Sequence, residues 1–165
     1  MRSGECRGVT SKINGGLKNS AFSVFRDRCP TNREDRPVPA ESIKQEIAEK
    51  FLNALRSRNW ELMRTIMAPD IVWSLPGSSR ISGEAHGVDA VIARCQIITS
   101  YGLNFALKHV LYGQFGFALS LNNTAKCGDL VLDEHLATVC SLREGKIGRI
   151  DTYLSDLPMA NAFFA

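Results

Sequence analysis

The chain has 165 residues, of which 44% are hydrophobic and 22% are charged, a composition typical of one globular domain. Residues 1–36 carry eight basic and four acidic side chains, whereas residues 37–165 carry twelve basic and thirteen acidic ones. The excess positive charge therefore lies outside the predicted domain, which argues against a nucleic-acid partner. No apolar run approaches the roughly 18–20 residues of a membrane span, so we expect no membrane partner either.

Residues 1–40 mix Gly, Ser, Asn, Arg and Pro without a helical or strand period, and they end in the proline-rich stretch CPTNREDRPVPA. We interpret residues 1–40 as a disordered basic tail and linker, and residues 41–165 as the folded domain. A basic organelle presequence is the alternative, although four acidic residues in this segment weigh against it.

Three helices are predicted in the first half of the domain. The first is ESIKQEIAEKFLNALRSRN, with Ser42 as its N-cap and Gln45 at the capping-box spacing. Its apolar stripe consists of Ile43, Ile47, Phe51, Leu52 and Leu55. The second is NWELMRTIM with Asn59 as its cap, and the third is VDAVIARCQIITSYG, which ends at Gly102. A short strand, DIVWSL, and a loop, GSSRISGEAHG, separate the second and third helices.

Everything after Gly102 alternates between polar and apolar residues or turns. Four strands are predicted near residues 104–112, 115–122, 130–142 and 147–154. The turn signals between them are Gly113–Gly116, Asn122–Asn123, Cys127–Asp129 and Glu144–Gly145. Helices followed by antiparallel strands predict an α+β fold, in which a curved antiparallel sheet and three N-terminal helices form a cup.

The cysteines and histidines show no metal-binding pattern. Five widely spaced cysteines without a CxxC, and three histidines without HxH or HxxxH spacing, predict neither a disulfide framework nor a zinc site. We therefore expect no metal, no cofactor, reduced thiols and a cytoplasmic location. Cys95 and Cys140 lie in apolar stretches and are expected in the core.

Several segments resemble the nuclear transport factor 2-like superfamily, and within it the SnoaL-like polyketide cyclases and ketosteroid isomerases. APDIVWSLPGSSRISGEAHGVDAVIAR resembles the first strand, glycine loop and third helix of this superfamily. LREGKIGRIDTYLSD resembles its terminal hairpin, and NAFFA its closing segment. The resemblance covers residues 41–165 and implies a cone-shaped fold that encloses a pocket and forms a homodimer through the outer face of the sheet.

The resemblance also allows site residues to be carried over one by one. In ketosteroid isomerases a tyrosine, a basic aspartate and a protonated aspartate do the chemistry; here Phe51, Ser74 and Ala137 occupy those positions. The steroid-isomerase mechanism is therefore lost. Limonene epoxide hydrolases use an Arg-x-Asp pair, which His135 and Ala137 replace, and a second aspartate that matches Asp151.

SnoaL-like cyclases use a histidine on the penultimate strand and an aspartate on the last. Asp151 lies close to that aspartate, and His135 lies two residues upstream of that histidine. The resemblance thus implies cofactor-free cyclisation, isomerisation or dehydration of an apolar carbonyl-containing metabolite, with Asp151 as the base and His135 as its partner. We expect the substrate-binding residues to be Ser74, Trp73, Tyr153, His109, Phe51 and Ala137. A non-catalytic ligand-binding or protein-association module is the alternative function.

The last hairpin predicts which side chains share a face. A three-residue loop over Arg143–Gly145 pairs Leu142 with Lys146, and this register puts Ala137 opposite Asp151. Odd-numbered positions then form a charged face and even-numbered positions an apolar face. Either the apolar face packs against the helices and the charged face meets solvent, or the charged face lines the cup. The resemblance favours the second arrangement, which would place His135 and Asp151 inside the pocket.

Overall fold

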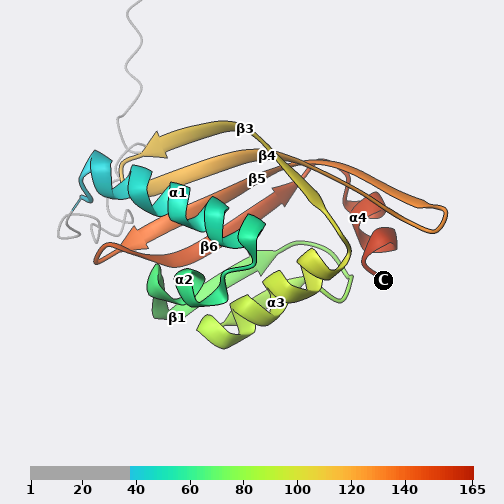
Figure 1. The fold of residues 1–165 in the computed structure, drawn as a ribbon, viewed down its shortest axis with the longest axis horizontal. Coiled ribbons are helices and arrows are strands. Elements are labelled where there is room, and N and C mark those ends of the chain that lie inside the picture. Colours follow the sequence, from blue (N-terminus) through green and yellow to red (C-terminus); the bar gives the residue numbers. More distant parts are fainter. Residues whose placement is uncertain (1–37) are drawn as a thin grey trace, which may run out of the picture. The chain divides into compact units, whose positions relative to one another are not determined.

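The computed structural model describes residues 38–165, in which most helices precede most strands (Figure 1). The helices are α1 (Glu41–Ser57), α2 (Trp60–Thr65), α3 (Val88–Ser100) and α4 (Leu157–Phe163). The strands are β1 (Met67–Leu75), β2 (Gly83–His86), β3 (Asn104–Gly113), β4 (Gly116–Cys127), β5 (Leu130–Arg143) and β6 (Lys146–Leu154). The predicted disordered tail over residues 1–40 falls almost wholly outside the described residues and stays a prediction.

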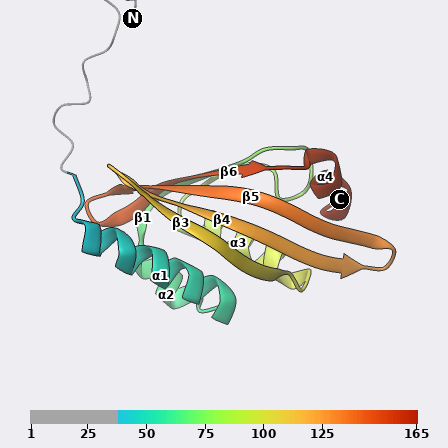
Figure 2. The same cartoon turned by 90° about the horizontal axis from the view of Figure 1, so that it is seen from above.

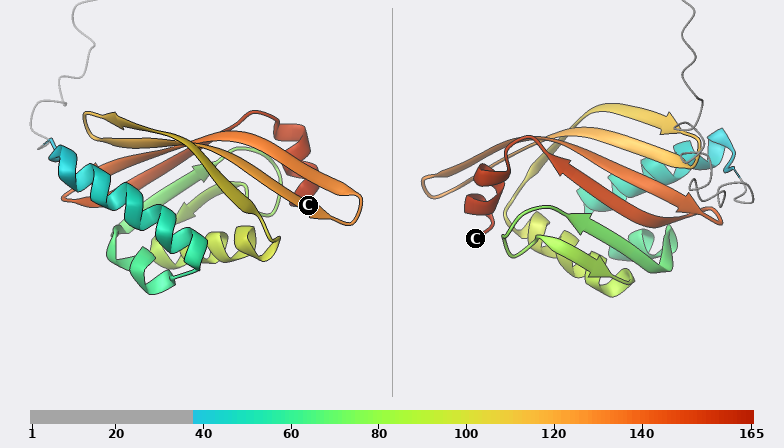
Figure 3. Two further views of the ribbon diagram at one scale, coloured as in Figure 1. Left: turned by 45° about the horizontal axis from the view of Figure 1, so that its top comes forward. Right: turned by 180° about the vertical axis from the view of Figure 1, so that it is seen from behind.

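The six strands form one curved sheet in the order β2-β1-β6-β5-β4-β3 (Figure 2). Helices α1, α2 and α3 lie over one face, and in the described part of the chain no helix covers the other face (Figure 3). The predicted α+β fold with a curved sheet and three N-terminal helices is confirmed. The sheet is not wholly antiparallel, however, because β1 and β6 run parallel to each other.

Helix α1 begins differently from the prediction. Its N-cap is Ala40, which makes no side-chain cap bond, so Ser42 lies inside the helix and the predicted capping box is wrong. The buried stripe includes Lys44, whereas Ile43 is exposed. Lys44 Nζ donates a hydrogen bond of 2.8 Å to the carbonyl oxygen of Gly113, which ties the start of α1 to the end of β3. The helix is therefore rotated so that an aliphatic lysine stem, with its amine satisfied, faces the sheet.

The other helix boundaries follow their sequence signals. Asn59 caps α2 by accepting a hydrogen bond of 3.0 Å from the Leu62 amide, as predicted. Gly102 follows α3 with φ +69°, the left-handed conformation of a helix stop. Two elements were not predicted: β2 lies within the glycine-rich loop, and α4 follows β6. Asp156 caps α4 through the Met159 amide at 2.9 Å, with a proline in the first turn, a signal visible in the sequence.

Strand β4 continues through the predicted Asn122–Asn123 turn. It ends only at Cys127, and the chain reverses at Gly128, whose φ is +58°. Asn122 therefore pairs with His135, and Asn123 pairs with Glu134. The predicted turn at these asparagines is wrong, because the ladder to β5 outweighs the local turn preference of asparagine.

The β5–β6 hairpin has a shorter loop than predicted. Arg143 pairs with Lys146 across Glu144 and Gly145, whose φ values of +52° and +71° define a two-residue turn. A register shift between Ser141 and Leu142 moves the pairing by one more residue. Asp151 therefore lies opposite Val139 rather than Ala137. The predicted loop is therefore too long by one residue, and the predicted pairing is displaced by one position next to the loop and by two positions from Ser141 onward. Because the displacement beyond the irregularity is even, the side chains there keep their predicted face-sharing neighbours.

The even-numbered face of β5 packs against the helices. Leu132, Cys140 and Leu142 are each at most 2% exposed on this face, whereas His135 on the odd-numbered face is exposed. The apolar face therefore lies inside the cup, and the assignment of the charged face to its interior is wrong. Cys95 and Cys140 are buried core residues, as predicted, and burial raises the pKa of the Cys95 thiol to about 12.

The close approach of β4 to β5 at Gly116 gives a test of this register. A Cβ on Gly116 would lie 1.9 Å from the Cys140 carbonyl oxygen, whereas the nearest atom to a Cβ on Gly113 lies 3.9 Å away. We expect Gly116→Ala to lower the free energy of unfolding by at least about 2 kcal/mol, because main chain must move. Gly113→Ala is the matched control and should change it by less than about 0.5 kcal/mol in urea titrations. Equal stability of the two variants would contradict the register.

Candidate functional site

A pocket lies between the helix-covered face of the sheet and helices α1, α3 and α4. The pocket has a volume of about 60 Å³. The walls are mostly apolar. The polar side chains among its lining residues are Ser79, Asn123, Glu134, Thr138 and Thr152. A mostly apolar lining with few polar groups is typical of a site for a small organic molecule, and the volume of about 60 Å³ is small beside the roughly 300–1,000 Å³ of such sites.

Glu134 is the ionisable side chain among the pocket-lining residues, and it is only 2% exposed. Its Oε1 accepts hydrogen bonds from the Ser155 amide at 2.5 Å, the Ser155 hydroxyl at 3.0 Å and the Asp156 amide at 3.1 Å. These donors lie between the end of β6 and the start of α4. They fix the carboxyl group while its Oε2, buried as well, has no protein partner. A fixed carboxyl with one free oxygen can bind or exchange a proton with a molecule in the pocket.

Asn123 lies beside Glu134 on the neighbouring strand, at the position directly opposite it in the β4–β5 ladder. It is 9% exposed, and its Oδ1 has no hydrogen-bond partner. Buried polar atoms without partners are uncommon in folded proteins. Two of them on adjacent residues of one pocket mark this spot as the place where a ligand would find hydrogen bonds.

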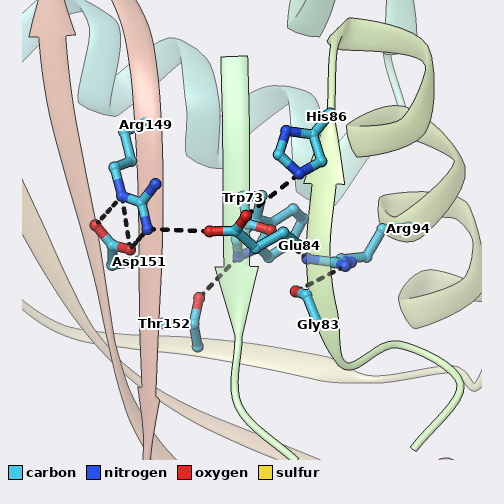
Figure 4. A network of polar contacts seen from close by, with 8 residues as sticks. All are labelled: Trp73, Gly83, Glu84, His86, Arg94, Arg149, Asp151 and Thr152. Carbon is cyan, nitrogen blue, oxygen red and sulfur yellow. Dashed lines mark hydrogen bonds and ion pairs between the residues drawn. The ribbon is translucent and has the colours of Figure 1, made fainter.

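Trp73 forms one wall of the pocket, and hydrogen bonds fix both its indole ring and its main-chain carbonyl group (Figure 4). Its Nε1 donates a hydrogen bond of 2.9 Å to Thr152 Oγ1. Arg94 donates to the Trp73 carbonyl oxygen at 2.7 Å and to the Gly83 carbonyl oxygen at 3.1 Å, with its guanidinium carbon 5.4 Å from the indole ring centroid. Burial lowers the pKa of Arg94. The buried arginine thus ties β1 to β2 and fixes the tryptophan ring in its position.

The structure does not bring His135 and Asp151 together, and neither residue lines the pocket. His135 is exposed and its Nε2 lies 3.4 Å from Asn122 Nδ2. Asp151 accepts hydrogen bonds of 2.9 and 3.0 Å from Arg149 Nε on the outer face. The prediction that these two side chains share an enclosed apolar pocket is wrong, because His135 on β5 and Asp151 on β6 both lie on the face of the sheet that points away from the helices.

Asp151 belongs instead to a row of ion-paired side chains on the outer face of β6, β1 and β2 (Figure 4). Arg149 reaches Glu84 at 3.5 Å, and Glu84 reaches His86 Nε2 at 3.2 Å. The hydrogen bond to Asp151 is the main cause that raises the pKa of Arg149. Exposed pairs of this kind contribute little to stability, and they supply no desolvated catalytic group.

The predicted substrate-binding residues divide into those that line the pocket and those that do not. Phe51 and Trp73 line the pocket, as predicted. Ser74, Ala137, Tyr153 and His109 do not line it. Ser74 precedes the inward-facing Leu75 and follows the inward-facing Trp73, so it points outward, and Tyr153 is 62% exposed on the outer face. Their predicted contact with a substrate inside the cup is therefore wrong.

Within residues 38–165, no group of three or more His, Cys, Asp or Glu side chains is placed to hold a metal ion. None of the helices in this range is long and apolar enough to cross a membrane.

No protein-family model matches the sequence, and no curated protein matches it with statistical significance. Solved structures do match. Bal32a from a soil-derived mobile gene cassette is 23% identical with a TM-score of 0.71, and the match covers 75% of this chain and 98% of that one. An NTF2-like protein from Burkholderia xenovorans is 18% identical with a TM-score of 0.64, over 75% and 98% of the two chains. The chain has the NTF2-like fold.

A candidate polyketide cyclase from Sinorhizobium meliloti shares the NTF2-like fold with this chain, at 14% identity and a TM-score of 0.54 over 66% and 94% of the two chains. These identities establish the fold and leave the activity to the site itself, since one fold hosts many chemistries. In this NTF2-like chain the sequence did contain a signal for Glu134. It interrupts the otherwise apolar even-numbered run Leu132, Leu136 and Cys140, where a lone charge is rare without a special role.

The bond between Trp73 and Thr152 can be tested directly. We expect Thr152→Val to lower the free energy of unfolding by about 1–3 kcal/mol, because it leaves a buried indole N–H without an acceptor. The indole proton of Trp73 should move upfield in a ¹H–¹⁵N spectrum. Thr152→Ser keeps the hydroxyl and should leave that resonance in place. An unchanged Trp73 resonance in Thr152→Val would disprove the bond.

Proposed function

We propose that the pocket is the active site of a cofactor-free enzyme that moves a proton on a small apolar carbonyl compound, with Glu134 as the acid/base group. One observation carries the proposal. The carboxyl group of Glu134 is buried in an apolar pocket, fixed through Oε1 by three donors and unpartnered at Oε2. A positioned carboxyl group inside a mostly apolar pocket is what general acid/base catalysis needs.

The chemistry follows from the placement of the two unpartnered groups. Glu134 Oε2 would take a proton from the carbon next to a carbonyl, as that C–H bond breaks and its electron pair moves to the carbonyl oxygen as an enolate. The carboxamide of Asn123, on the adjacent strand, supplies a polar contact for the substrate next to this carboxyl. Return of the proton to another carbon is an isomerisation, and attack of the enolate carbon on a second carbonyl is a cyclisation.

The comparison with solved structures supports the reaction class. The Sinorhizobium meliloti protein with this fold is described as a polyketide cyclase candidate, and cyclisation is one of the two outcomes proposed for this pocket. The placement of a single carboxyl in the pocket of this chain differs from the histidine–aspartate arrangement that the sequence resemblance implied. The proposed reaction therefore depends on Glu134, and Asp151 and His135 have no part in it.

The proposal predicts proton exchange at carbon. In deuterium oxide, the protein should catalyse incorporation of deuterium next to the carbonyl of a small ketone or β-diketone that enters the pocket. Glu134→Gln should reduce this exchange at least about 100-fold, because the amide cannot accept the proton. Its carbonyl oxygen can still accept the bonds from Ser155 and Asp156, so the fold should survive. Mass spectrometry of the recovered ketone measures the exchange.

The outer-face residues supply matched controls for this experiment. His135→Ala and Asp151→Asn should each keep more than half of the exchange rate, since neither side chain lines the pocket. A loss of exchange in these variants, with full activity in Glu134→Gln, would refute the assignment.

A second candidate function is ligand binding without catalysis, which one specific observation favours. All three donors to Glu134 Oε1 belong to the junction of β6 and α4, so this carboxyl also secures α4. If that were its whole role, the pocket would bind the ketone but the rate of deuterium incorporation would equal the rate without protein.

We also propose that the protein forms a homodimer through the outer face of the sheet. Leu111, Val131 and Tyr153 expose 58%, 58% and 62% of their surface, at strand positions that point away from the helices. Native mass spectrometry should show a dimer, and Tyr153→Arg should shift it to monomer. Tyr112→Arg is the control, because Tyr112 pairs with the inward-facing Phe117 and points to the other face. A wild-type protein that remains monomeric at every concentration would contradict this proposal.

A further inference from the structure

A second, polar cleft borders the apolar pocket. It lies where the ends of α1 and α3 meet the start of β3, and it has a volume of about 240 Å³. Leu55, Leu103 and Phe105 line both the cleft and the pocket. The two spaces are therefore neighbours that share three apolar walls.

Two arginines line this cleft and retain free donors. Arg56 Nη2 donates to the Phe105 carbonyl oxygen at 3.3 Å, and Arg58 Nη2 donates to the Thr99 carbonyl oxygen at 3.0 Å. Within residues 38–165 neither guanidinium has a carboxylate at ion-pair distance, in contrast to Arg64 and Arg143. Each guanidinium has five N–H groups, so most of them remain available to an anion.

The backbone at Arg58 adds an independent observation. Arg58 is the C-cap of α1 and has φ +55°, a left-handed conformation that glycine or asparagine adopts at lower cost. An arginine at this position makes the helix end less stable than a glycine would. We take this cost as a sign that the side chain of Arg58 has a function of its own. The fixed carbonyl contact directs that side chain to the cleft.

We propose that the cleft binds the carboxylate of an amphipathic ligand whose apolar body lies in the pocket. The inference rests on the proposed function, in that the pocket must accept a small molecule, and it names the class of that molecule. Leu55, Leu103, Phe105, Thr99 and Asn104 complete the lining of the cleft, so no acidic side chain opposes an anion there. Paired guanidinium groups bind carboxylates and phosphates through several N–H donors at once.

The ladder across the sheet sets the length of the ligand. Phe105 pairs with Asn123, and Asn123 pairs with Glu134, so the three residues form one row across β3, β4 and β5. Two strand spacings separate Phe105 from Glu134, which is about 10 Å. The anionic end of the ligand and its reacting carbon should therefore be separated by about 10 Å, as in a medium-chain keto acid.

Three probes with the same alkyl chain test the proposal: octanoate, octyl phosphate and 1-octanol, each titrated by calorimetry. Wild-type protein should bind octanoate at least about tenfold more tightly than 1-octanol. Octyl phosphate distinguishes a carboxylate site from a general anion site, and tighter binding of the phosphate would overturn the choice of carboxylate. Equal binding of octanoate and 1-octanol would overturn the anion site while leaving the pocket intact as a small-molecule site.

Variants locate the effect. Arg56→Gln and Arg58→Asn should each weaken octanoate binding about five- to tenfold without changing 1-octanol binding, and asparagine suits the left-handed backbone at position 58. Lys50→Gln removes the same charge from a half-exposed position of α1 outside the cleft and should have less than a twofold effect. Full octanoate preference in the double variant Arg56→Gln, Arg58→Asn would refute the proposal, and failure of all three probes to bind would refute both it and the pocket function.

Discussion

The side chains of β5 alternate between the two faces of the sheet, and this alternation decides which ionisable groups can meet a molecule inside the cup. Glu134 and His135 are adjacent in the sequence but lie on opposite faces, one 2% exposed and the other open to solvent. Because the period of a strand is two residues, no small shift in register could exchange them unless the whole apolar set of β5 moved outward. Burial of Leu132, Cys140 and Leu142 thus fixes Glu134 inside the pocket.

A buried carboxyl group costs free energy unless it is hydrogen-bonded, and the junction of β6 and α4 provides the bonds here. Ser155 and Asp156 donate to one oxygen of Glu134, while Asp156 caps α4 with its own side chain. The same turn therefore closes the pocket with α4 and orients its acid. Any motion of α4 would change the position of Glu134, so opening of the pocket and activity of the carboxyl group should be coupled.

Most of the fold could be predicted from the sequence, because it follows from local signals. The stripe of α1, the Asn59 cap and the Gly102 stop all rest on interactions within a few residues. The site could be predicted only in part. Phe51 and Trp73 line the pocket, and their contact with a substrate stays a prediction. Hydrophobic alternation shows only that β5 has two different faces. Which face the helices cover depends on packing between distant segments, and the resemblance to cyclases pointed to the wrong one. Asn123 was missed because asparagine pairs are typical of turns, whereas here cross-strand pairing extends the strand.

The distribution of charge along the pocket then limits what can bind. The cleft contains two arginines that have no carboxylate partner within residues 38–165, the neighbouring pocket contains a carboxyl group with one free oxygen, and three apolar side chains line both spaces. A neutral apolar molecule would leave both ends unsatisfied, and a short anion would reach only the arginines. An elongated molecule with an anion at one end and a carbonyl near the other would satisfy the guanidinium groups and place its acidic carbon beside Glu134. In this arrangement, binding energy at the cleft would position the carbon where the proton transfer occurs.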